Sequence, residues 1–345
     1  MYIYRDGLES MHIELTNKCN ARCPQCSRTN NQQIEDSQVE ITLKQFKQYF
    51  NAEFIRRLKK IKFCGNFGDP AMAKDCVPIH QYIIECNPNI DLTFDTNGGI
   101  RTATFWKELG KFYVGKPESF VIFHIDGMED TNHIYRADVS YSNVMKNAKA
   151  AISTGARVVW AFIPFMHNEH QVEDAEELSK KMGFYKFAVK ISSRFEHKLQ
   201  PFSYKDAKTG ITKQIFPATS PEFNVSELLA NLDKPVCTAE KRKEIYIDAR
   251  GRLLPCCWYG SGYETNEAFR HAVDEQHTPD LNNTTVDAAL DTPLFHNIKD
   301  AWDTPDNVLN KPCYKKCSGK LMHFWRIDGT ITPQKNYAEW LREEL

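Results

Sequence analysis

The sequence lacks any long apolar run, and no stretch approaches the roughly 18 residues that a membrane-spanning helix needs. Its first residues, MYIYRD, lack the charged and apolar regions of a signal peptide. A formal net charge of −1 gives no excess of either sign that would favour nucleic acid or an anionic membrane. These absences predict a cytoplasmic protein with no membrane partner, and they disfavour a nucleic-acid partner.

The composition is otherwise ordinary for a globular protein of 345 residues, with 41% hydrophobic and 26% charged residues. This length predicts one large domain, alone or with one small domain. Cysteine is the informative residue type. Eleven cysteines in a reducing compartment indicate metal ligands or buried thiols rather than disulfides.

Three of these cysteines lie within eight residues, in the segment CNARCPQC that follows an alternating apolar run. Cys19, Cys23 and Cys26 can supply three thiolates to one metal centre, whereas a tetrahedral zinc site or a cubane iron–sulfur cluster needs four ligands. A remote residue or a small molecule must therefore complete the site. A zinc loop closed by a distant Cys or His remains an alternative, although zinc loops favour paired C-x2-C units.

The pattern C-x3-C-x2-C after a first strand resembles that of the radical S-adenosylmethionine (SAM) enzymes. The resemblance implies that Cys19, Cys23 and Cys26 hold a [4Fe–4S] cluster whose fourth iron binds the amino and carboxylate groups of SAM. In that family, one electron cleaves SAM to methionine and a 5′-deoxyadenosyl radical, which abstracts a hydrogen atom from the substrate. The resemblance also implies an electron donor such as a flavodoxin or a ferredoxin.

Short apolar strands alternate with helical stretches between residues 11 and 194. We expect strands near 11–16, 60–65, 91–96, 119–126, 156–164 and 186–192, and helices near 42–58, 76–86, 102–113, 140–154 and 169–182. The strands are rich in Ile, Val and Phe, as is typical of parallel strands covered on both faces. We therefore predict an α/β fold, a partial (β/α)6 TIM-type barrel with its chemistry at the carboxyl ends of the strands. The family's fold agrees with this count.

The character of the chain changes after about residue 195. We predict a barrel over 1–195, then a connector with a small hairpin over 196–232. A small C-terminal α+β domain is expected over 233–320, and a mostly helical tail over 321–345. Within the third part, 244–254 is expected to form a strand, a turn and a second strand, and 284–303 to be helical.

Seven residues near strand ends match positions that contact SAM in the family: Gly68, Asp69, Asn97, His124, Asp126, Arg136 and Asn168. Gly68 and Asp69 lie in CGNFGDP, which resembles the family's GGEP segment for the SAM amino group, with Phe67 and Asp69 replacing a glycine and the glutamate. Arg136 is expected to pair with the SAM carboxylate, a task that suits a bidentate guanidinium.

Three of the remaining positions also have a plain structural interpretation. Asn97 lies in an Asn-Gly pair that resembles the family's TNG segment and could equally form an ordinary turn. His124 stands at a position that contacts ribose in the family and could be a core histidine. Asn168, in a His-Asn-Glu segment that lies near the adenine in relatives, could instead cap a helix.

A second group of cysteines follows the pattern Cys237-x13-Gly251-x4-Cys256 and then Cys313-x3-Cys317. Four thiolates form a closed ligand set for a second [4Fe–4S] cluster, although four such cysteines could also bind zinc. The arrangement resembles the twitch domain, a shortened SPASM domain with one auxiliary cluster. Cys257, next to Cys256, is a rival ligand.

The expected activity is that of a radical SAM oxidoreductase that carries out a net oxidation, a dehydrogenation or a crosslink, of a peptide or protein. A sugar or nucleotide dehydrogenase and a non-catalytic zinc or iron–sulfur module are the alternatives. About ten residues precede the first strand, so we expect no N-terminal peptide-recognition domain. The basic run 311–326, with interleaved aromatic residues, is interpreted as a solvated rim rather than a nucleic-acid patch.

Overall fold

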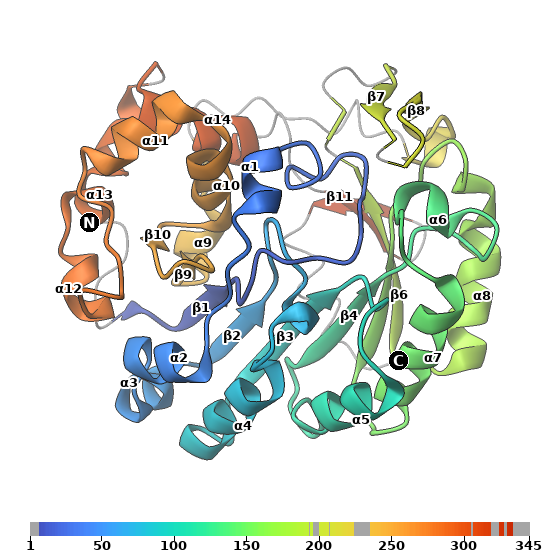
Figure 1. The fold of residues 1–345 in the computed structure, drawn as a ribbon, viewed down its shortest axis with the longest axis horizontal. Helices are drawn as coiled ribbons and strands as arrows, with labels where there is room; N and C mark the ends of the chain where they lie inside the picture. Colours follow the sequence, from blue (N-terminus) through green and yellow to red (C-terminus); the bar gives the residue numbers. More distant parts are fainter. Residues whose placement is uncertain are drawn as a thin grey trace. The chain divides into compact units, whose positions relative to one another are not determined.

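The computed structural model describes residues 7–192, 194–195, 200–206, 208–223, 235–304, 306–318, 324–327 and 330–333. The chain divides into two compact units. The first unit comprises Met1–Cys19, Asn31–Phe94 and Ala230–Leu321, and the second comprises Asn20–Asn30, Asp95–Leu229 and Met322–Leu345. Figure 1 labels most of the helices and strands of both units.

The first unit contains five strands, β1 (Ser10–Ile13), β2 (Lys60–Phe63), β3 (Asp91–Thr96), β9 (Glu244–Ile247) and β10 (Leu253–Leu254). They lie in the order β10-β9-β1-β2-β3. Strand β1 is parallel to both of its neighbours, with Met11 opposite Ile61 in β2 and Ile245 in β9. Strands β2 and β3 are also parallel, and β10 returns antiparallel to β9.

The strand–turn–strand unit expected over 244–254 is therefore present, but its first strand also extends the N-terminal sheet. Main-chain groups of β1 pair with β9 over four residues each, from Ser10 opposite Glu244 to Ile13 opposite Ile247. The edge of β1 would otherwise present unpaired N–H and C=O groups. The sequence did not predict this pairing between segments more than two hundred residues apart.

The helices of the N-terminal part of this unit are α1 (Gln32–Asp36), α2 (Leu43–Tyr49), α3 (Ala52–Arg57), the 3-10 helix η2 (Pro70–Met72) and α4 (Cys76–Cys86). Helices α2, α3 and α4 pack together beside the strands (Figure 1). The single helix expected over 42–58 is two helices. Thr42 and Gln45 form a capping box for α2, and the Asn51 side chain accepts a hydrogen bond from Phe54 N at 2.9 Å to begin α3.

The C-terminal part of the first unit contains short helices, α9 (Thr238–Lys241), α10 (Cys257–Thr265), α11 (Glu267–Asp274), α12 (Val286–Leu290), α13 (Pro293–Asn297), η6 (Asp300–Asp303), η7 (Val308–Asn310) and α14 (Lys311–Cys317). The helical stretch expected over 284–303 is thus divided into three. Pro293 begins α13, and a proline is favourable at the first helical position because it lacks the N–H that would be unsatisfied there.

The second unit contains the parallel strands β4 (Phe120–His124), β5 (Val158–Phe162) and β6 (Lys186–Ile191), followed in the sheet by β11 (Phe324–Ile327) and β12 (Thr330–Pro333). Ile122 lies opposite Val159, and Trp160 opposite Phe187. Every residue of β5 is buried, as the apolar sequence VVWAF predicts.

The expectation of a mostly helical tail over 321–345 is wrong for its described residues. Strand β11 pairs antiparallel with β6, and β12 pairs antiparallel with β11. This pairing satisfies main-chain groups along β6 that an edge strand would leave open. The rest of the tail lies outside the described residues.

The helices of the second unit are α5 (Ala103–Lys111), α6 (Asn132–Tyr135), α7 (Tyr141–Ile152), η3 (Glu169–Gln171), α8 (Val172–Met182) and η4 (Pro221–Phe223). Strands β7 (Phe202–Lys205) and β8 (Thr212–Ile215) form the small antiparallel hairpin expected in the connector. The other connector residues, 196–199, 207 and 224–232, lie outside the described part. A buried cluster that includes Phe120, Ile122 and Val159 forms part of the core of this unit.

All six strands expected from residues 11–194 are present, and the predicted α/β architecture with parallel strands is confirmed. In the described part of the chain, no helix has both the length and the apolar character to cross a membrane. Several predicted site residues follow directly after strand ends. Asp69, Asn97 and Asp126 come a few residues after β2, β3 and β4.

Candidate functional site

Two predicted site residues of the second unit, Arg136 and Asp126, form an ion pair beside Cys23. Arg136 Nε donates a hydrogen bond to Asp126 Oδ2 at 2.7 Å, and Arg136 Nη1 lies 3.7 Å from Cys23 Sγ. Burial lowers the pKa of the Arg136 guanidinium, but the attraction of Asp126 outweighs it and keeps the cation charged. Burial raises the pKa of the Cys23 thiol, and Arg136 acts in the opposite direction. Arg136 therefore holds a permanent positive charge beside Cys23, a predicted cluster ligand.

Asp126 is held firmly in place by main-chain groups. Its Oδ1 accepts a hydrogen bond from Ile163 N at 2.7 Å, and its own N–H donates to Asn132 Oδ1 at 2.9 Å. The carboxylate is fully buried, so leaving it without partners would be costly. These contacts fix the orientation of Arg136 from three different segments of the second unit.

Asn168 supports the same arrangement from behind. Its Nδ2 donates to Asp126 O at 2.9 Å and to Ile163 O at 3.1 Å, and its Oδ1 accepts from Phe165 N at 2.6 Å. Asn168 is the N-cap residue of η3, as the cap interpretation predicts, but its side chain makes no capping hydrogen bond to that helix. In this structure the Asn168 side chain stabilises the loop that carries Asp126 through these hydrogen bonds. The place of Asn168 near the adenine remains a prediction.

Several hydrogen bonds within the second unit hold the segment that carries Cys23 and Cys26 in place. Asn97 Nδ2 donates to Asn20 Oδ1 at 2.9 Å, Arg22 N donates to Ala137 O at 2.9 Å, and Arg194 Nη1 donates to Gln25 O at 3.1 Å. Arg28 also donates to Ala21 O. Sequence reasoning did not find Arg194, which carries no motif and is recognisable only from its contact.

Asn97 thus links the third strand's loop to the cysteine segment. Its Oδ1 also accepts from Gly99 N at 2.8 Å, as in an ordinary Asn-Gly turn, so the turn interpretation is confirmed. Gly98 has φ +71°, and a Cβ at this position would lie 2.4 Å from Phe123 Cδ1. Only glycine fits this backbone position.

His124 pairs with a residue that the sequence did not suggest. Its Nε2–H donates to Asp95 Oδ1 at 2.8 Å. Burial lowers the pKa of His124, although Asp95 acts against this, so the imidazole is neutral near pH 7. A neutral ring oriented by a carboxylate can still donate or accept a hydrogen bond, but a fixed positive charge is not expected here.

In the first unit, the predicted GGEP-like segment is shaped by Glu14, which sequence reasoning also missed. Glu14 Oε1 accepts hydrogen bonds from Phe67 N at 2.8 Å and Gly68 N at 3.1 Å, and its Oε2 accepts from the Tyr246 hydroxyl. Burial raises the pKa of Glu14 to about 7, while these donors lower it. A glutamate directly after an apolar strand is the signal that could have revealed it.

Gly68 and Asp69 both have local structural tasks. A Cβ on Gly68 would lie 1.8 Å from Thr16 O, so the close approach of the two backbones requires glycine. Asp69 N donates to Lys18 O at 2.9 Å, and Asp69 Oδ1 accepts from Ala71 N at 3.0 Å at the start of η2. Asp69 is therefore a cap in this structure, and its predicted role toward the SAM amino group remains a prediction.

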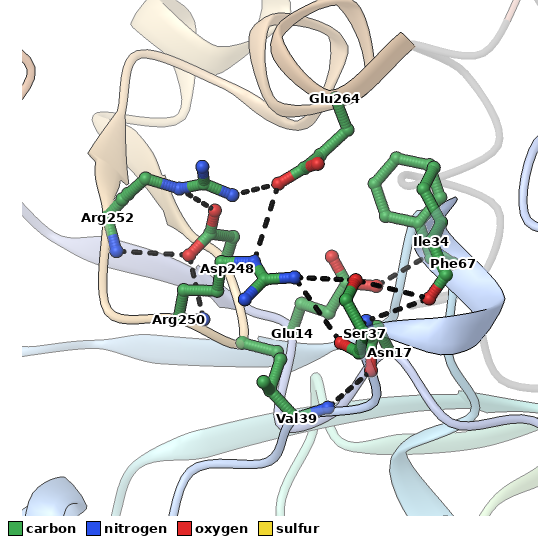
Figure 2. Close-up of a pocket in the computed structure, with 11 residues that line it drawn as sticks. Glu14, Asn17, Ile34, Ser37, Val39, Phe67, Asp248, Arg250, Arg252 and Glu264 are labelled. Atoms are coloured by element: carbon green, nitrogen blue, oxygen red, sulfur yellow. Dashed lines mark hydrogen bonds and ion pairs between the residues drawn. The ribbon is translucent and has the colours of Figure 1, made fainter. Parts of the chain in front are cut away.

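Beside Glu14 lies a hollow of about 280 Å³, part of it open to solvent, which Figure 2 shows with its lining residues. Arg250 Nη2 donates to Ser37 Oγ at 2.7 Å, and Arg252 Nε donates to Asp248 Oδ2 at 2.6 Å (Figure 2). Arg252 also pairs with Glu264. These opposite charges neutralise one another. The residues around the hollow therefore form mainly a polar network that joins the β9–β10 hairpin to residues 34–39.

The four C-terminal cysteines are brought together within the first unit. Beyond the effect of burial, Cys257, Cys237 and Cys313 raise the pKa of the Cys256 thiol, and Cys237, Cys313 and Cys257 raise that of Cys317. Val236 N donates to Cys317 O at 2.9 Å, which joins the two segments directly. Burial raises the pKa of Cys313 and of Cys317 to about 12, so iron binding must remove protons from these thiols.

Cys256 and Cys257 lie at the start of helix α10. Cys256 is the residue that precedes the helix, and Cys257 is its first residue. Burial raises the pKa of Cys257 to about 11, and the charges nearest to it are Lys62, Glu244 and Arg242. Cys257 nevertheless also raises the pKa of the Cys256 and Cys317 thiols, so it stays a rival ligand beside them.

The thiols and their surroundings fit iron–sulfur clusters. Cys19 ends a segment of the first unit, and Cys23 and Cys26 belong to the second. In the cysteine segment, neither polar atom of the buried Gln25 side chain has a hydrogen-bond partner among the described residues. Among all the residues that the structure describes, no three Cys, His, Asp or Glu side chains converge on one metal ion. A cubane does not need such convergence, because each of its four irons takes its own ligand.

The family model of the radical SAM superfamily matches residues 13–180, which include the three-cysteine segment and the loops after the first five strands. Over these residues the chain is similar to the radical SAM superfamily.

Two curated relatives are GTP 3′,8-cyclases. The protein from Nautilia profundicola is 21% identical over 287 residues, which cover 76% of this chain and 85% of the relative. The protein from Sulfurimonas denitrificans is 24% identical over 205 residues, which cover 56% of this chain and 60% of the relative. Among solved structures, SuiB of Streptococcus suis bound to S-adenosylmethionine is similar with a TM-score of 0.56 and 14% identity, over 85% of this chain and 68% of SuiB. At that identity the similarity concerns the fold alone.

Proposed function

We propose that the chain is a radical SAM enzyme with two [4Fe–4S] clusters that carries out a net oxidation of its substrate. In this proposal Cys19, Cys23 and Cys26 hold the SAM-binding cluster, and Cys237, Cys256, Cys313 and Cys317 hold the auxiliary cluster. When bound, the clusters supply the electron that cleaves SAM and accept the electron that the substrate radical loses. The substrate thereby loses one hydrogen atom, one electron and one proton.

The observation that carries the proposal is the position of Arg136. The guanidinium is charged, oriented by Asp126 and 3.7 Å from Cys23 Sγ. A carboxylate that binds an iron beside Cys23 would meet this cation directly, and a guanidinium offers a fork of donors that suits a carboxylate. The amino acid part of SAM has the required carboxylate.

The closed set of four C-terminal thiols supports an oxidative outcome. Four cysteines satisfy all four irons of a cubane, so none remains for direct binding of substrate. Such a cluster can accept the electron of a substrate radical or hold the fold together. A reaction that returns the hydrogen atom to the substrate would not need an acceptor, so dehydrogenation or crosslinking is favoured.

We propose a peptide or protein as the substrate, in line with the resemblance of the C-terminal cysteine pattern to twitch and SPASM enzymes. This is an inference by analogy. A second candidate, a nucleoside triphosphate, is favoured by the names of the curated relatives, which are GTP 3′,8-cyclases. A flavodoxin or ferredoxin is the proposed electron donor.

Anaerobic reconstitution with iron and sulfide tests the proposal. With SAM and dithionite, the reconstituted protein should form 5′-deoxyadenosine and methionine, whereas a non-catalytic zinc or iron–sulfur module would leave SAM intact. Adding GTP then separates the two substrate classes. We expect GTP to be unchanged, and GTP consumption coupled to 5′-deoxyadenosine formation would favour the nucleotide instead.

A further inference from the structure

The donors of the Arg136 guanidinium are divided between two partners in the second unit. Its Nε donates to Asp126 Oδ2 at 2.7 Å, and its Nη1 donates to Cys23 Sγ at 3.7 Å. A guanidinium carries five N–H donors in a fixed plane, and these two bonds do not use those of Nη2. The contact with the sulfur therefore leaves donors for the carboxylate of SAM, the partner of Arg136 in the proposed function.

The guanidinium is held in this position from more than one side. Asp126 is 0% exposed and accepts a hydrogen bond from Ile163 N at 2.7 Å, so the partner of Nε is itself fixed. The guanidinium carbon lies 5.5 Å from the centroid of the Tyr135 ring, within the range of a cation–π contact. The fold thus places Nη1 beside Cys23.

The sulfur that accepts from Nη1 is well shielded from solvent, since Cys23 is 8% exposed. A hydrogen bond with a charged partner is strong where little water competes with it. A reduced cluster carries one more negative charge than an oxidised one, and its ligand sulfurs share that charge. A cationic donor to a ligand sulfur therefore stabilises the reduced form more than the oxidised form.

We propose that Arg136 has a second role, in which it donates an N–H···S hydrogen bond to the Cys23 ligand and raises the reduction potential of the SAM-binding cluster. The inference rests on the proposed function, because it needs a cluster at Cys19, Cys23 and Cys26. Arg136 acts here through Cys23, as a positioning residue. It makes the cluster easier to reduce for the proposed flavodoxin or ferredoxin.

The test uses the full-length chain in which only the SAM-binding cluster remains, with Cys237, Cys256, Cys313 and Cys317 replaced by Ala. Redox titration without SAM, followed by electron paramagnetic resonance, then reports one potential that SAM binding does not influence. In this background Arg136→Gln should keep about four irons per chain. The ratio of reduced to oxidised cluster at a fixed potential should fall roughly tenfold, because a hydrogen bond between charged groups is lost.

Arg157→Gln is the matched control. Arg157 is another arginine of the second unit, and its Nη1 donates to Pro117 O at 2.7 Å, so its loss should leave the potential unchanged. If Arg136→Gln fails to fold because Asp126 has lost its cation, Asp126→Asn is added. The two amides can bond to each other, the net charge of the pair is unchanged, and the potential should still fall.

If the background with four replaced cysteines lacks iron, the titration is made in the chain that keeps all its cysteines. The signal that disappears when Cys19, Cys23 and Cys26 are replaced by Ala then reports the same cluster.

An unchanged potential in an Arg136 variant that keeps its iron would overturn the second role of Arg136 and leave the SAM-binding cluster standing. The cluster assignment fails instead if replacing Cys19, Cys23 and Cys26 by Ala removes no iron, and this inference fails with it. Iron analysis before the titration therefore distinguishes the two failures.

Discussion

Arg136, which is partly exposed, and the buried Asp126 form an ion pair, with 2.7 Å between Nε and Oδ2, that is complete without any ligand. Asp126 is itself fixed by Ile163 N and by Asn132, so the guanidinium cannot swing away from Cys23 without breaking buried contacts. An orientation fixed in advance reduces the entropy lost when an anionic group binds. The pair is the part of the second unit best suited to hold a carboxylate.

Replacing Arg136 by Ala should weaken SAM binding by about tenfold or more, because removing one partner of a desolvated charged hydrogen bond costs roughly 2–5 kcal/mol. The iron content should stay the same, since the thiols remain. Equilibrium binding of SAM to the reconstituted protein measures the effect. Arg157→Ala is the control, because Arg157 is an exposed cation of the same unit that bonds to Pro117 O at 2.7 Å. Equal SAM affinity in the two variants would contradict the role of Arg136.

Asp69 requires two substitutions to separate its structural task from a ligand contact. Asp69→Ala removes the bond to Ala71 N and should lower the free energy of unfolding by about 1 kcal/mol, the usual effect of losing a cap. Asp69→Asn keeps the cap and removes the charge. It should retain stability and weaken SAM binding less than Arg136→Ala does. If SAM binds Asp69→Asn and the parent equally, Asp69 is only a cap.

Iron analysis tests the assignment of the second cluster. The reconstituted chain should contain about eight irons, and about four after Cys237, Cys256, Cys313 and Cys317 are replaced by Ala. Cys257→Ser should retain about eight, because Cys237, Cys256, Cys313 and Cys317 already supply the four ligands that the proposed cluster needs. Loss of about four irons from Cys257→Ser would show that Cys257 is a ligand.

Glu14 should make stability depend on pH. Burial raises its pKa from the ordinary 4.5 to about 7, so between these values the folded chain binds more protons than the unfolded one. The contribution of Glu14 to stability is therefore full below about pH 4.5 and decreases as pH rises to about 7, by on the order of 3 kcal/mol.

Glu14→Gln keeps an oxygen for Phe67 N and Gly68 N and removes the titration. Urea unfolding of both proteins at pH 5 and at pH 8 measures the difference. The variant should gain stability relative to the parent as pH rises. A constant difference between the two proteins across this range would show that Glu14 does not titrate there.

The strands of the fold were predictable because each is a local apolar run bounded by polar turn residues, as in VVWAF of β5. Helix boundaries were harder to predict where a single capping residue decides them. Asn51 divides one expected helix into two. Strand β11 was missed because its partner β6 is more than one hundred residues earlier in the chain, although Asp-Gly between the β11 and β12 sequences is typical of a hairpin.

The cysteines of the site were predictable from their spacing, whereas the residues that support them were not. Glu14 and Asp95 belong to no motif, and each acts through a neighbour that only the folded chain supplies. The hydrogen bonds of Asn168 to Asp126 O and Ile163 O could not be predicted from the sequence, and its place near the adenine remains a prediction. Contacts between distant segments depend on packing, which spacing in the sequence does not encode.

The most direct test of the central claim is reductive SAM cleavage by the chain with Cys19, Cys23 and Cys26 all replaced by Ala. After anaerobic reconstitution, the amount of 5′-deoxyadenosine formed with SAM and dithionite should fall to the level without protein, while about four irons remain in the auxiliary cluster. Formation of 5′-deoxyadenosine at the parent rate would contradict the assignment of the SAM-cleaving cluster.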